Sequence, residues 1–306
     1  MGCLMEKSKF FSDEDLVLLI PLNTEKIKDR HVIQLHSGEK FHTKNGMILH
    51  DDIIGKTPGS IISTHIGFNY IALDPTLKDI IKHYPKFRYK TQIIYPRDWG
   101  LIMAFSGIKN GDLIVEIGTG SGAFTAFLSN IIGPEGKIFS YEVDPDRARI
   151  AEENLRNTCS TKNYIIKIKN AEDGIDERGV DIVFIDVPEP WRVLRNAWQA
   201  LRFGGQVVVY IPTFNQLQKT LKVMLLYGFI DVSVKEGFIR DFQIKPYAVR
   251  PKIKGYYFSA FIVFGRKGTF IPIKQIKEAL KNLNKKQEGS ICHRKIKRKE
   301  HSAFLF

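Results

Sequence analysis

The sequence predicts an α/β protein in which a seven-stranded, doubly wound sheet follows a small β-domain. From residue 91 onward, stretches with the period of strands alternate with stretches of helical period, as in sheets that carry helices on both faces. A β-branched run at residues 114–117 leads directly into three alternating glycines and then a helical pattern. Before residue 74, the apolar runs are short and separated by turn residues.

Composition and periodicity divide the 306 residues into four parts. We expect a β-domain at 1–74, a helical connector at 75–90, the α/β domain at 91–267 and a basic extension at 268–306. Apolar residues make up 43% of the chain, which is enough for a core. No run approaches the roughly 20 apolar residues of a membrane-spanning helix, and the first ten residues lack a signal-peptide core, so we expect a cytoplasmic protein without membrane contact.

The small β-domain is predicted from short apolar runs and the turns between them. Residues 16–20 and 31–35 are expected strands, and Asn45-Gly46 is typical of a type I′ hairpin turn. Helical spacing begins at residues 75–81, and the basic stretch 86–90 leads into the large domain.

The large domain is predicted to contain seven strands. We expect them at 114–117, 138–142, 164–169, 180–185, 206–211, 229–234 and 257–264, with helices at 99–105, from 123, and at 145–157, 191–201 and 215–227. The last two strands are joined by a loop rather than a helix. On fold analogy this favours a methyltransferase sheet over a nicotinamide-binding one.

The glycine turn follows the first strand of the large domain. Glycine is needed there because a side chain would block the approach of a ligand to the backbone, and we expect the N–H groups at the helix start to serve as donors. Because residues 118–123 also satisfy G-x-G-x-x-A, a nicotinamide enzyme, an S-adenosylmethionine enzyme and a turn without ligand all remain open. Glu142, roughly 20 residues later, suits ribose hydroxyls in either enzyme.

A second informative stretch, Ile-Asp-Val-Pro-Glu-Pro-Trp at 185–191, ends the fourth strand. Ligands of open α/β sheets bind outside the carboxyl ends of strands, so we expect Asp186 in the same crevice as Gly118 and Glu142. The prolines fix φ, and Trp191 offers a flat surface. The alternative is a helix start with Asp186 as its cap.

A third stretch precedes the first helix of the large domain. Thr91 and Tyr95 are candidates to close over a cofactor. Alternatively, Pro96 and Asp98 simply begin the helix.

Charge points to a polyanionic partner. The net charge is +13, and the segment from Lys267 onward carries +8 of it, with eleven Lys/Arg and three acidic residues. Within that segment, Ile273, Ile276, Leu280 and Leu283 predict a helix docked on the body, whereas residues 292–301 suit either nucleic-acid contact or a solvated tail.

Three scattered cysteines and eight histidines without ligand spacing predict no metal site.

Five segments together resemble a known family. Residues 41–56, 92–98, 116–122, 186–191 and 249–251 are similar to the tRNA (adenine-N1)-methyltransferases that act in the T-loop, and the likeness covers about residues 15–267. It implies a Rossmann-like S-adenosylmethionine methyltransferase sheet, S-adenosylmethionine as cofactor, tRNA as partner and methylation at position 58, with 57 left open. It also implies a homo-oligomer, a tetramer in the archaeal form.

The resemblance also implies roles for individual residues. Glu142 would hold the ribose and Asp186 would meet the target adenine. Expected cofactor contacts are Thr91, Gln92, Tyr95, Glu116, Gly118, Thr119, Gly120, Ser121, Gly122, Ala123, Glu142, Val143, Asn170, Ala171 and Asp186. Apart from the resemblance, we expect substrate contacts from Pro188, Trp191, Arg240, Lys245 and Arg250, of which the basic residues suit phosphate.

Two departures from the family stand out. Asn170 replaces an Asp, although its amide oxygen still suits the exocyclic amine of the cofactor's adenine. Residues 257–260, Tyr-Phe-Ser-Ala, replace a Gly-His-Thr-Gly run.

The chemistry fits the resemblance. Methyl transfer to adenine N1 needs alignment rather than a base, because N1 has a free lone pair. Asp186 could stabilise the charge that grows on the purine and later take a proton from its exocyclic amine. The alternatives are a methyltransferase for proteins or small molecules, a non-catalytic tRNA-binding subunit and a nicotinamide dehydrogenase. For the last we find no hydride-transfer acid or base beside the glycines.

Overall fold

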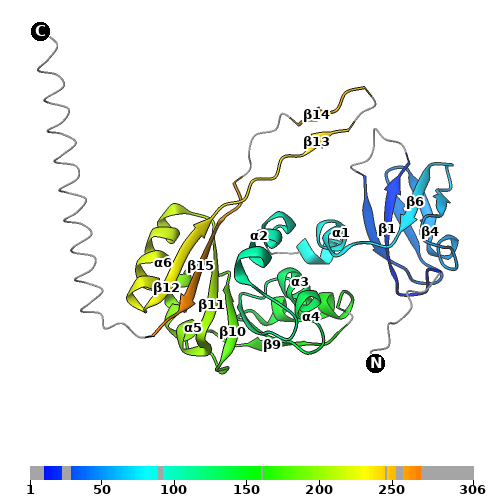
Figure 1. Ribbon diagram of the computed structural model, residues 1–306. Coiled ribbons are helices and arrows are strands. Elements are labelled where there is room, and N and C mark those ends of the chain that lie inside the picture. The colour runs from blue at the N-terminus through cyan, green and yellow to red at the C-terminus, as the bar shows by residue number, and fades with distance from the viewer. Residues whose placement is uncertain are drawn as a thin grey trace, which may run out of the picture. The chain divides into compact units, whose positions relative to one another are not determined.

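The computed structural model describes residues 10–22, 29–88, 92–159, 161–244, 247–252 and 258–269 (Figure 1). The chain divides into two compact units. The first comprises Met1–Gly100, Lys109–Gly111 and Gly118–Lys169, and the second Leu101–Ile108, Asp112–Ile117 and Asn170–Phe306. The four-part division expected from composition stays a prediction, and the helix expected at 273–283 lies outside the described residues.

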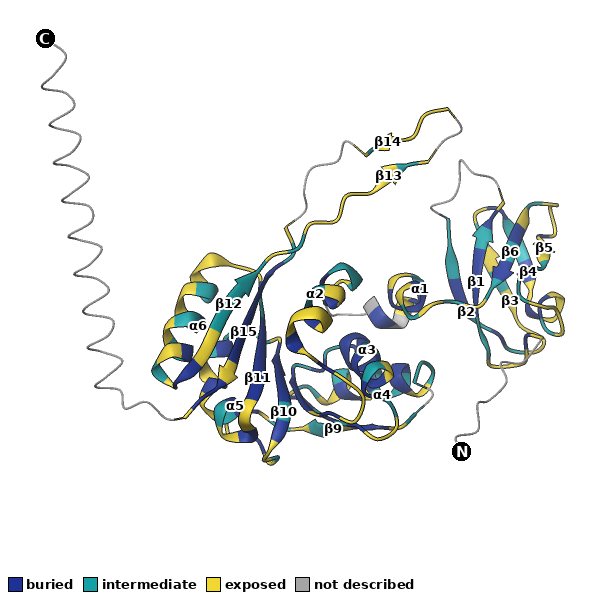
Figure 2. Ribbon diagram, in the orientation of Figure 1, coloured by how far each residue is buried: buried dark blue, intermediate teal, exposed yellow. Residues whose placement is uncertain are grey.

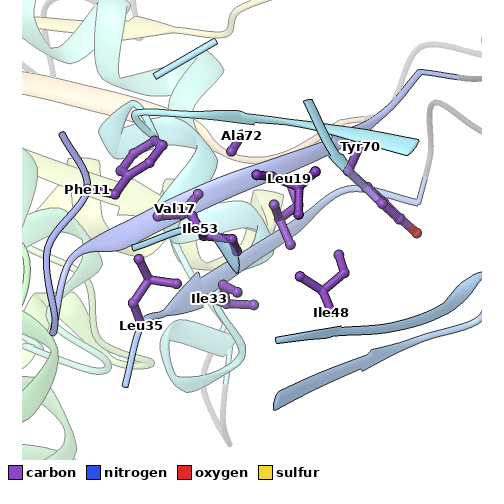
Figure 3. Packing of buried hydrophobic residues seen from close by; sticks show 10 residues of the cluster. Phe11, Val17, Leu19, Ile33, Leu35, Ile48, Ile53, Tyr70 and Ala72 are labelled. Atoms are coloured by element: carbon purple, nitrogen blue, oxygen red, sulfur yellow. The ribbon is translucent and has the colours of Figure 1, made fainter. Parts of the chain in front are cut away.

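The first unit begins with a four-stranded antiparallel sheet. Its order is β2-β1-β6-β5, formed by β1 (Leu16–Pro21), β2 (His31–Gln34), β5 (Ile61–Ser63) and β6 (Asn69–Leu73). Both strands expected here are confirmed. One face of this sheet packs against the segments that follow β2 and forms a core of apolar side chains, shown in Figure 3. The core includes Val17, Leu19, Ile33, Leu35, Ile48, Ile53 and Tyr70. The period of two along β1 and β6 therefore produces a core of its own for this sheet.

The hairpin predicted at Asn45-Gly46 is formed by β3 (Lys40–Thr43) and β4 (Gly46–Leu49), but its turn is not type I′. Type I′ requires positive φ at both central residues. The residues between the paired Thr43 and Gly46 are Lys44 and Asn45, and neither has a positive φ, whereas Gly46 has a φ of 107°. The Thr43 hydroxyl accepts the Asn45 N–H at 2.9 Å. Glycine therefore serves as the residue after the turn.

The rest of the first unit supplies the connector and one edge of the large sheet. α1 (Leu77–His83) starts with a capping box between Thr76 and Asp79, and α2 (Pro96–Ser106) begins in this unit, three residues earlier than expected because Pro96 suits the first turn. The elements after the glycine turn are α3 (Ala123–Ile132), β8 (Lys137–Glu142), α4 (Pro145–Arg156) and β9 (Tyr164–Ile168). All four were expected, within a few residues.

The seven predicted strands of the large domain are confirmed. They form one sheet in the order β12-β15-β11-β10-β7-β8-β9. The second unit contributes five strands to this sheet, namely β7 (Leu113–Ile117), β10 (Val180–Ile185), β11 (Leu201–Ile211), β12 (Phe229–Lys235) and β15 (Phe261–Lys267). β10 runs parallel to β7 and β11, whereas β15 is antiparallel to β11 and β12. β10, β11 and β15 are largely buried, and α5 (Leu194–Ala200) and α6 (Phe214–Leu226) expose their outer faces (Figure 2).

Three boundaries in the second unit differ from expectation. The helix expected at 191–201 is a 3-10 turn (Pro190–Arg192) followed by α5, and β11 begins at Leu201 instead of 206. Gly204 and Gly205 interrupt the apolar run, but a shift in register after Val180 lets Leu201 pair with β10. The last strand begins at Phe261, where pairing with Ile211 starts, and not at 257.

A two-stranded segment between β12 and β15 was not expected. β13 (Phe242–Gln243) pairs with β14 (Arg250–Pro251), and both lie beyond the ends of β12 and β15 in Figure 1. We call residues 236–252 the arm. Its strands have two residues each, too short for a periodic signal in the sequence.

Candidate functional site

The glycine turn has the backbone conformation that the sequence predicts. Gly118, Gly120 and Gly122 have φ values of 100°, 56° and 79°, all in the region that side chains disfavour. The Gly118 N–H donates to the Tyr141 carbonyl at 2.9 Å, and the hydroxyls of Thr119 and Ser140 are 2.6 Å apart. The turn is therefore fixed to β8 by both backbone and side chain.

The Glu142 carboxylate, at the end of β8, is held by backbone donors. Its Oε2 accepts the Gly120 N–H at 3.0 Å, and its Oε1 accepts the N–H groups of Val143 and Asp144 at 3.0 and 3.1 Å. Arg147 Nε lies 3.5 Å from Oε1. A carboxylate has about four lone-pair positions, so Oε2 keeps one for a further donor such as a ribose hydroxyl.

Arg147 is a site residue that the sequence analysis missed. Asp144 caps α4 by accepting the N–H groups of Asp146 and Arg147, and this cap turns the first helical residues back toward β8. The sequence did contain a signal for it, namely a basic residue in the first turn of the helix that follows a strand ending in Glu.

The expectation that the N–H groups at the helix start serve as donors stays a prediction. Within the turn itself, the N–H groups of Gly118, Gly120 and Gly122 donate to Tyr141, Glu142 and Thr119, so all three are already paired. A dinucleotide pyrophosphate binds to backbone N–H donors of this kind, whereas a cationic sulfonium requires none. The paired N–H groups of these glycines therefore fit S-adenosylmethionine better than a nicotinamide dinucleotide.

In the second unit, Asp186 directly follows β10, at the carboxyl end of the strand. Its N–H donates to the Ile117 carbonyl at 2.9 Å, which continues the pairing of β10 with β7. Among the described residues, the carboxyl group makes no hydrogen bond or ion pair. Asp186 is exposed, yet protein lies close around the carboxyl group, and this desolvation raises the pKa of Asp186 to about 7. Such a shift at an accessible carboxyl is typical of functional groups.

The alternative in which Asp186 caps a helix is wrong. The 3-10 turn that follows begins at Pro190, and its N-cap residue is Glu189, which makes no side-chain cap hydrogen bond.

Glu116, in β7, is 2% exposed. A carboxylate buried this deeply is stable only when hydrogen-bond donors surround it, and a bound ligand is one source of such donors.

Side chains from α6 fix the segment after Asp186. Gln216 Nε2 donates to the Pro188 carbonyl at 2.8 Å, and Lys219 Nζ lies 3.9 Å from the centre of the Trp191 ring. Sequence reasoning missed both residues, because a helix polar on this face looks like any solvated surface. One face of Trp191 is therefore already covered by a cation.

The other predicted residues are distributed as follows. Gln92 Nε2 donates to the Tyr95 hydroxyl at 3.2 Å, and Tyr95 is 37% exposed. Ser121, Ala123 and Ala171 are buried, and the Ala171 carbonyl accepts a hydrogen bond from Asn196. Val143, Arg240 and Arg250 are exposed, and Arg250 belongs to β14. Thr91 and Lys245 lie outside the described residues.

Asn170 Oδ1 accepts the Glu172 N–H at 3.0 Å and keeps a second lone pair, so the contact expected with the cofactor's amine stays a prediction. Across the described part of the chain, no three His, Cys, Asp or Glu side chains gather as a metal site, and no helix has the length and apolar character to span a bilayer.

Comparison with known proteins places these residues in a family. Residues 81–254, more than half of the chain, match the family described as tRNA methyltransferase complex GCD14 subunit. The chain belongs to this family. Residues 23–62 match the TrmI-like N-terminal family, in agreement with the separate β-domain.

Relatives of this tRNA methyltransferase family cover most of the chain. The tRNA (adenine(57)-N(1)/adenine(58)-N(1))-methyltransferase TrmI of Methanocaldococcus jannaschii is 32% identical over 254 residues, 74% of this chain and 88% of that protein. The tRNA (adenine(58)-N(1))-methyltransferase TrmI of Thermus thermophilus is 28% identical over 78% of this chain and 94% of that protein.

Solved structures agree in fold. A SAM-dependent O-methyltransferase of Thermotoga maritima has a TM-score of 0.80 at 32% identity and covers 89% of this chain and 99% of that one. The tRNA (m1A58) methyltransferase TrmI of Aquifex aeolicus has a TM-score of 0.73 at 29% identity, over 85% and 100%. The expected methyltransferase sheet is thereby confirmed.

The glycine turn yields a stability prediction. A Cβ on Gly122 would lie 3.1 Å from Leu155 Cγ and 3.3 Å from the Ala151 carbonyl oxygen, in addition to the strain of its φ of 79°. Gly179 has a similar φ of 73° but open space around it. We expect Gly122→Ala to destabilise the protein by about 1–3 kcal/mol and more than the control Gly179→Ala. Thermal unfolding of both variants measures this, and equal melting temperatures would contradict it.

Proposed function

We propose that this protein is an S-adenosylmethionine-dependent tRNA (adenine-N1)-methyltransferase that acts at position 58 of the T-loop. Two relatives bear this activity in their names, with position 57 added in the M. jannaschii protein. The observation that carries the proposal is Asp186, an accessible carboxyl group without a protein partner among the described residues, at the carboxyl end of β10. Open α/β sheets bind their ligands at such ends.

The first unit supplies residues that suit the cofactor. When bound, S-adenosylmethionine supplies an electrophilic methyl group on a sulfonium. The Glu142 carboxylate keeps a lone pair for a ribose hydroxyl, and its contact with Gly120 fixes the turn before any ligand arrives. This preorganisation lowers the cost of binding. Gly118 and Gly120 allow the ligand to approach the backbone closely because they lack a Cβ.

Asp186 has a role that this chain's own geometry supports. Adenine N1 needs no base to become a nucleophile, so alignment supplies much of the rate. As positive charge grows on the purine, a carboxylate that accepts a hydrogen bond from the exocyclic amine stabilises it most in the transition state. Asp186 has no competing protein donor among the described residues. The same carboxylate could afterwards take the amine proton.

Binding to tRNA is supported by charge. The net charge of +13 favours a polyanion, and Arg240 and Arg250 are exposed in the arm, available to phosphate. The expectation of a cytoplasmic location stays a prediction.

The central test replaces Asp186 by Asn, which keeps the size and removes the carboxylate. We expect S-adenosylmethionine to bind Asp186→Asn within a few-fold of wild type in calorimetry, while methyl transfer to a tRNA transcript falls by roughly 10²–10⁴-fold. Mapping the methylated adenine in the wild-type product tests position 58 against 57. Full activity in Asp186→Asn would refute the role. Wild-type protein that binds no cofactor would instead indicate a non-catalytic subunit.

The pKa of Asp186 predicts the pH dependence of the reaction. The active form is the carboxylate, and desolvation raises its pKa to about 7, so protonation removes activity as the pH falls through that value. We expect kcat/KM to drop about tenfold per pH unit below pH 6 and to be constant above pH 8. Rates measured from pH 5.5 to 9 check this, and a flat profile down to pH 5.5 would contradict it.

We also propose that the protein assembles as a homo-oligomer, with four copies as the expected number. The arm exposes a run of large apolar side chains, namely Phe242 at 52%, Ile244 at 86%, Tyr247 at 107% and Val249 at 69%. Exposed apolar surface of this extent is typical of a protein interface. The arm follows β12, a strand of this chain's own sheet, so identical copies could bury one another's arms symmetrically.

Light scattering tests the assembly. The wild type should have about four times the 35.1 kDa of one chain, and Ile244→Lys with Tyr247→Lys should yield smaller species because buried charges are costly. Ile61→Lys, which changes a residue 61% exposed in the β-domain, is the control and should leave the mass unchanged. A monomeric wild type, or an arm variant of unchanged mass, would contradict the proposal.

A further inference from the structure

Three phenylalanine rings gather at the edge of the second unit's sheet where β11 ends. Phe261 is the first residue of β15 and pairs with Ile211, the last residue of β11. Its ring centre lies 4.6 Å from that of Phe214, at the start of α6, and 4.8 Å from that of Phe258. The interplanar angles of 53° and 56° are those of tilted aromatic contacts. Phe261 therefore supports two other rings.

The outer two rings are open to solvent. Phe214 is 74% exposed and Phe258 45%, whereas Phe261 is 7% exposed. An isolated exposed ring is ordinary, but two exposed rings fixed on a buried third form a surface with flat apolar faces. Phe214 is held by α6, which packs against β11 and β12, and Phe258 precedes β15 and contacts the ring of Phe261.

This aromatic surface lies at the same end of the sheet as Asp186. Ile185, which precedes Asp186, pairs with Val209 in β11, and Ile211 is two residues further along the same strand. Two strand spacings, roughly 10 Å, separate the strand of Asp186 from that of Phe261. The bond from Gln216 to the Pro188 carbonyl, at 2.8 Å, ties the first turn of α6 to the segment after Asp186.

Two lysines lie on the same helix as Phe214. Lys219 and Lys222 belong to α6, and Lys219 Nζ lies over the Trp191 ring at 3.9 Å. Glu189, the acidic residue of the neighbouring turn, is paired with Arg192 at 2.8 Å. The local balance is therefore basic, and it complements a phosphate backbone.

We propose that Phe214 and Phe258 form a stacking platform for an unpaired nucleotide next to the target adenine. The proposal rests on the proposed function. Aromatic faces beside cations bind single-stranded RNA by base stacking, and phenyl rings do so without reading the base because they carry no hydrogen-bonding group. The separation of roughly 10 Å assigns the platform to a neighbour rather than to the target itself. Trp191, with one face under Lys219, is less available for this role.

Substitution of Phe214 tests the platform. Phe214→Leu keeps apolar bulk and removes the flat ring, Phe214→Trp restores a ring, and Phe203→Leu is the control. Phe203 is 65% exposed in β11, near the start of the strand and thus at its opposite end. Transcripts of tRNA that carry 2-aminopurine directly 5′ or 3′ of the target adenine report stacking as fluorescence quenching.

We expect Phe214→Leu to lose the quenching at one of the two labels, and to raise the Kd and KM for tRNA by roughly 5- to 100-fold. S-adenosylmethionine affinity and the melting temperature should stay at wild-type values. Phe214→Trp should restore quenching and KM, and Phe203→Leu should behave as wild type. If wild type methylates tRNA and Phe214→Leu keeps full quenching and KM, the platform is wrong while the proposed function stands. If wild type methylates no tRNA, the proposed function itself fails.

Discussion

The contact between the Glu142 carboxylate and the Gly120 N–H, at 3.0 Å, organises the cofactor side of this protein. It joins the end of β8 to a turn whose glycines have backbone angles that other residues avoid. A second bond, from the Gly118 N–H to the Tyr141 carbonyl, joins the same turn to the preceding residue of β8. A turn in such a conformation is stable only when its surroundings determine it. The same carboxylate thus stabilises the turn and retains capacity for a ligand.

Glu142, in the first unit, and Asp186, in the second, have different surroundings. Glu142 receives three backbone N–H groups, and Arg147 Nε lies 3.5 Å from its Oε1, so this carboxylate is fixed in place. Asp186 has no such partner among the described residues, and desolvation raises its pKa to about 7. These surroundings suit the two carboxyl groups to different tasks. A fixed carboxylate suits binding, and one near neutrality suits a reaction in which charge appears on the substrate.

The sequence predicted the parts of the fold that depend on local pattern. The seven strands and the glycine turn follow from β-branched runs and from residues that permit positive φ. The start of β11 and the arm could not be predicted this way, because Leu201 pairs through a register shift and the arm strands have two residues each. For the candidate site, Glu142 and Asp186 were predicted from their places at strand ends, and their roles remain proposals. Arg147, Gln216 and Phe214 were missed, because their roles arise only when a helix start folds back onto the sheet.

Asn170 shows why residue identity alone did not determine a binding role. An Asp at this position could accept the Glu172 N–H with one oxygen and still offer the other to an amine. Asn170 accepts the Glu172 N–H with Oδ1 at 3.0 Å, and this amide oxygen has a second lone pair that can still accept a hydrogen bond from an amine. The amide nitrogen adds donors that an Asp lacks, and the complement of such a donor on an adenine edge is a ring nitrogen. Asn170 therefore keeps the Asx turn and gains a second kind of hydrogen bond to a base, so the identity of this residue alone does not select one role.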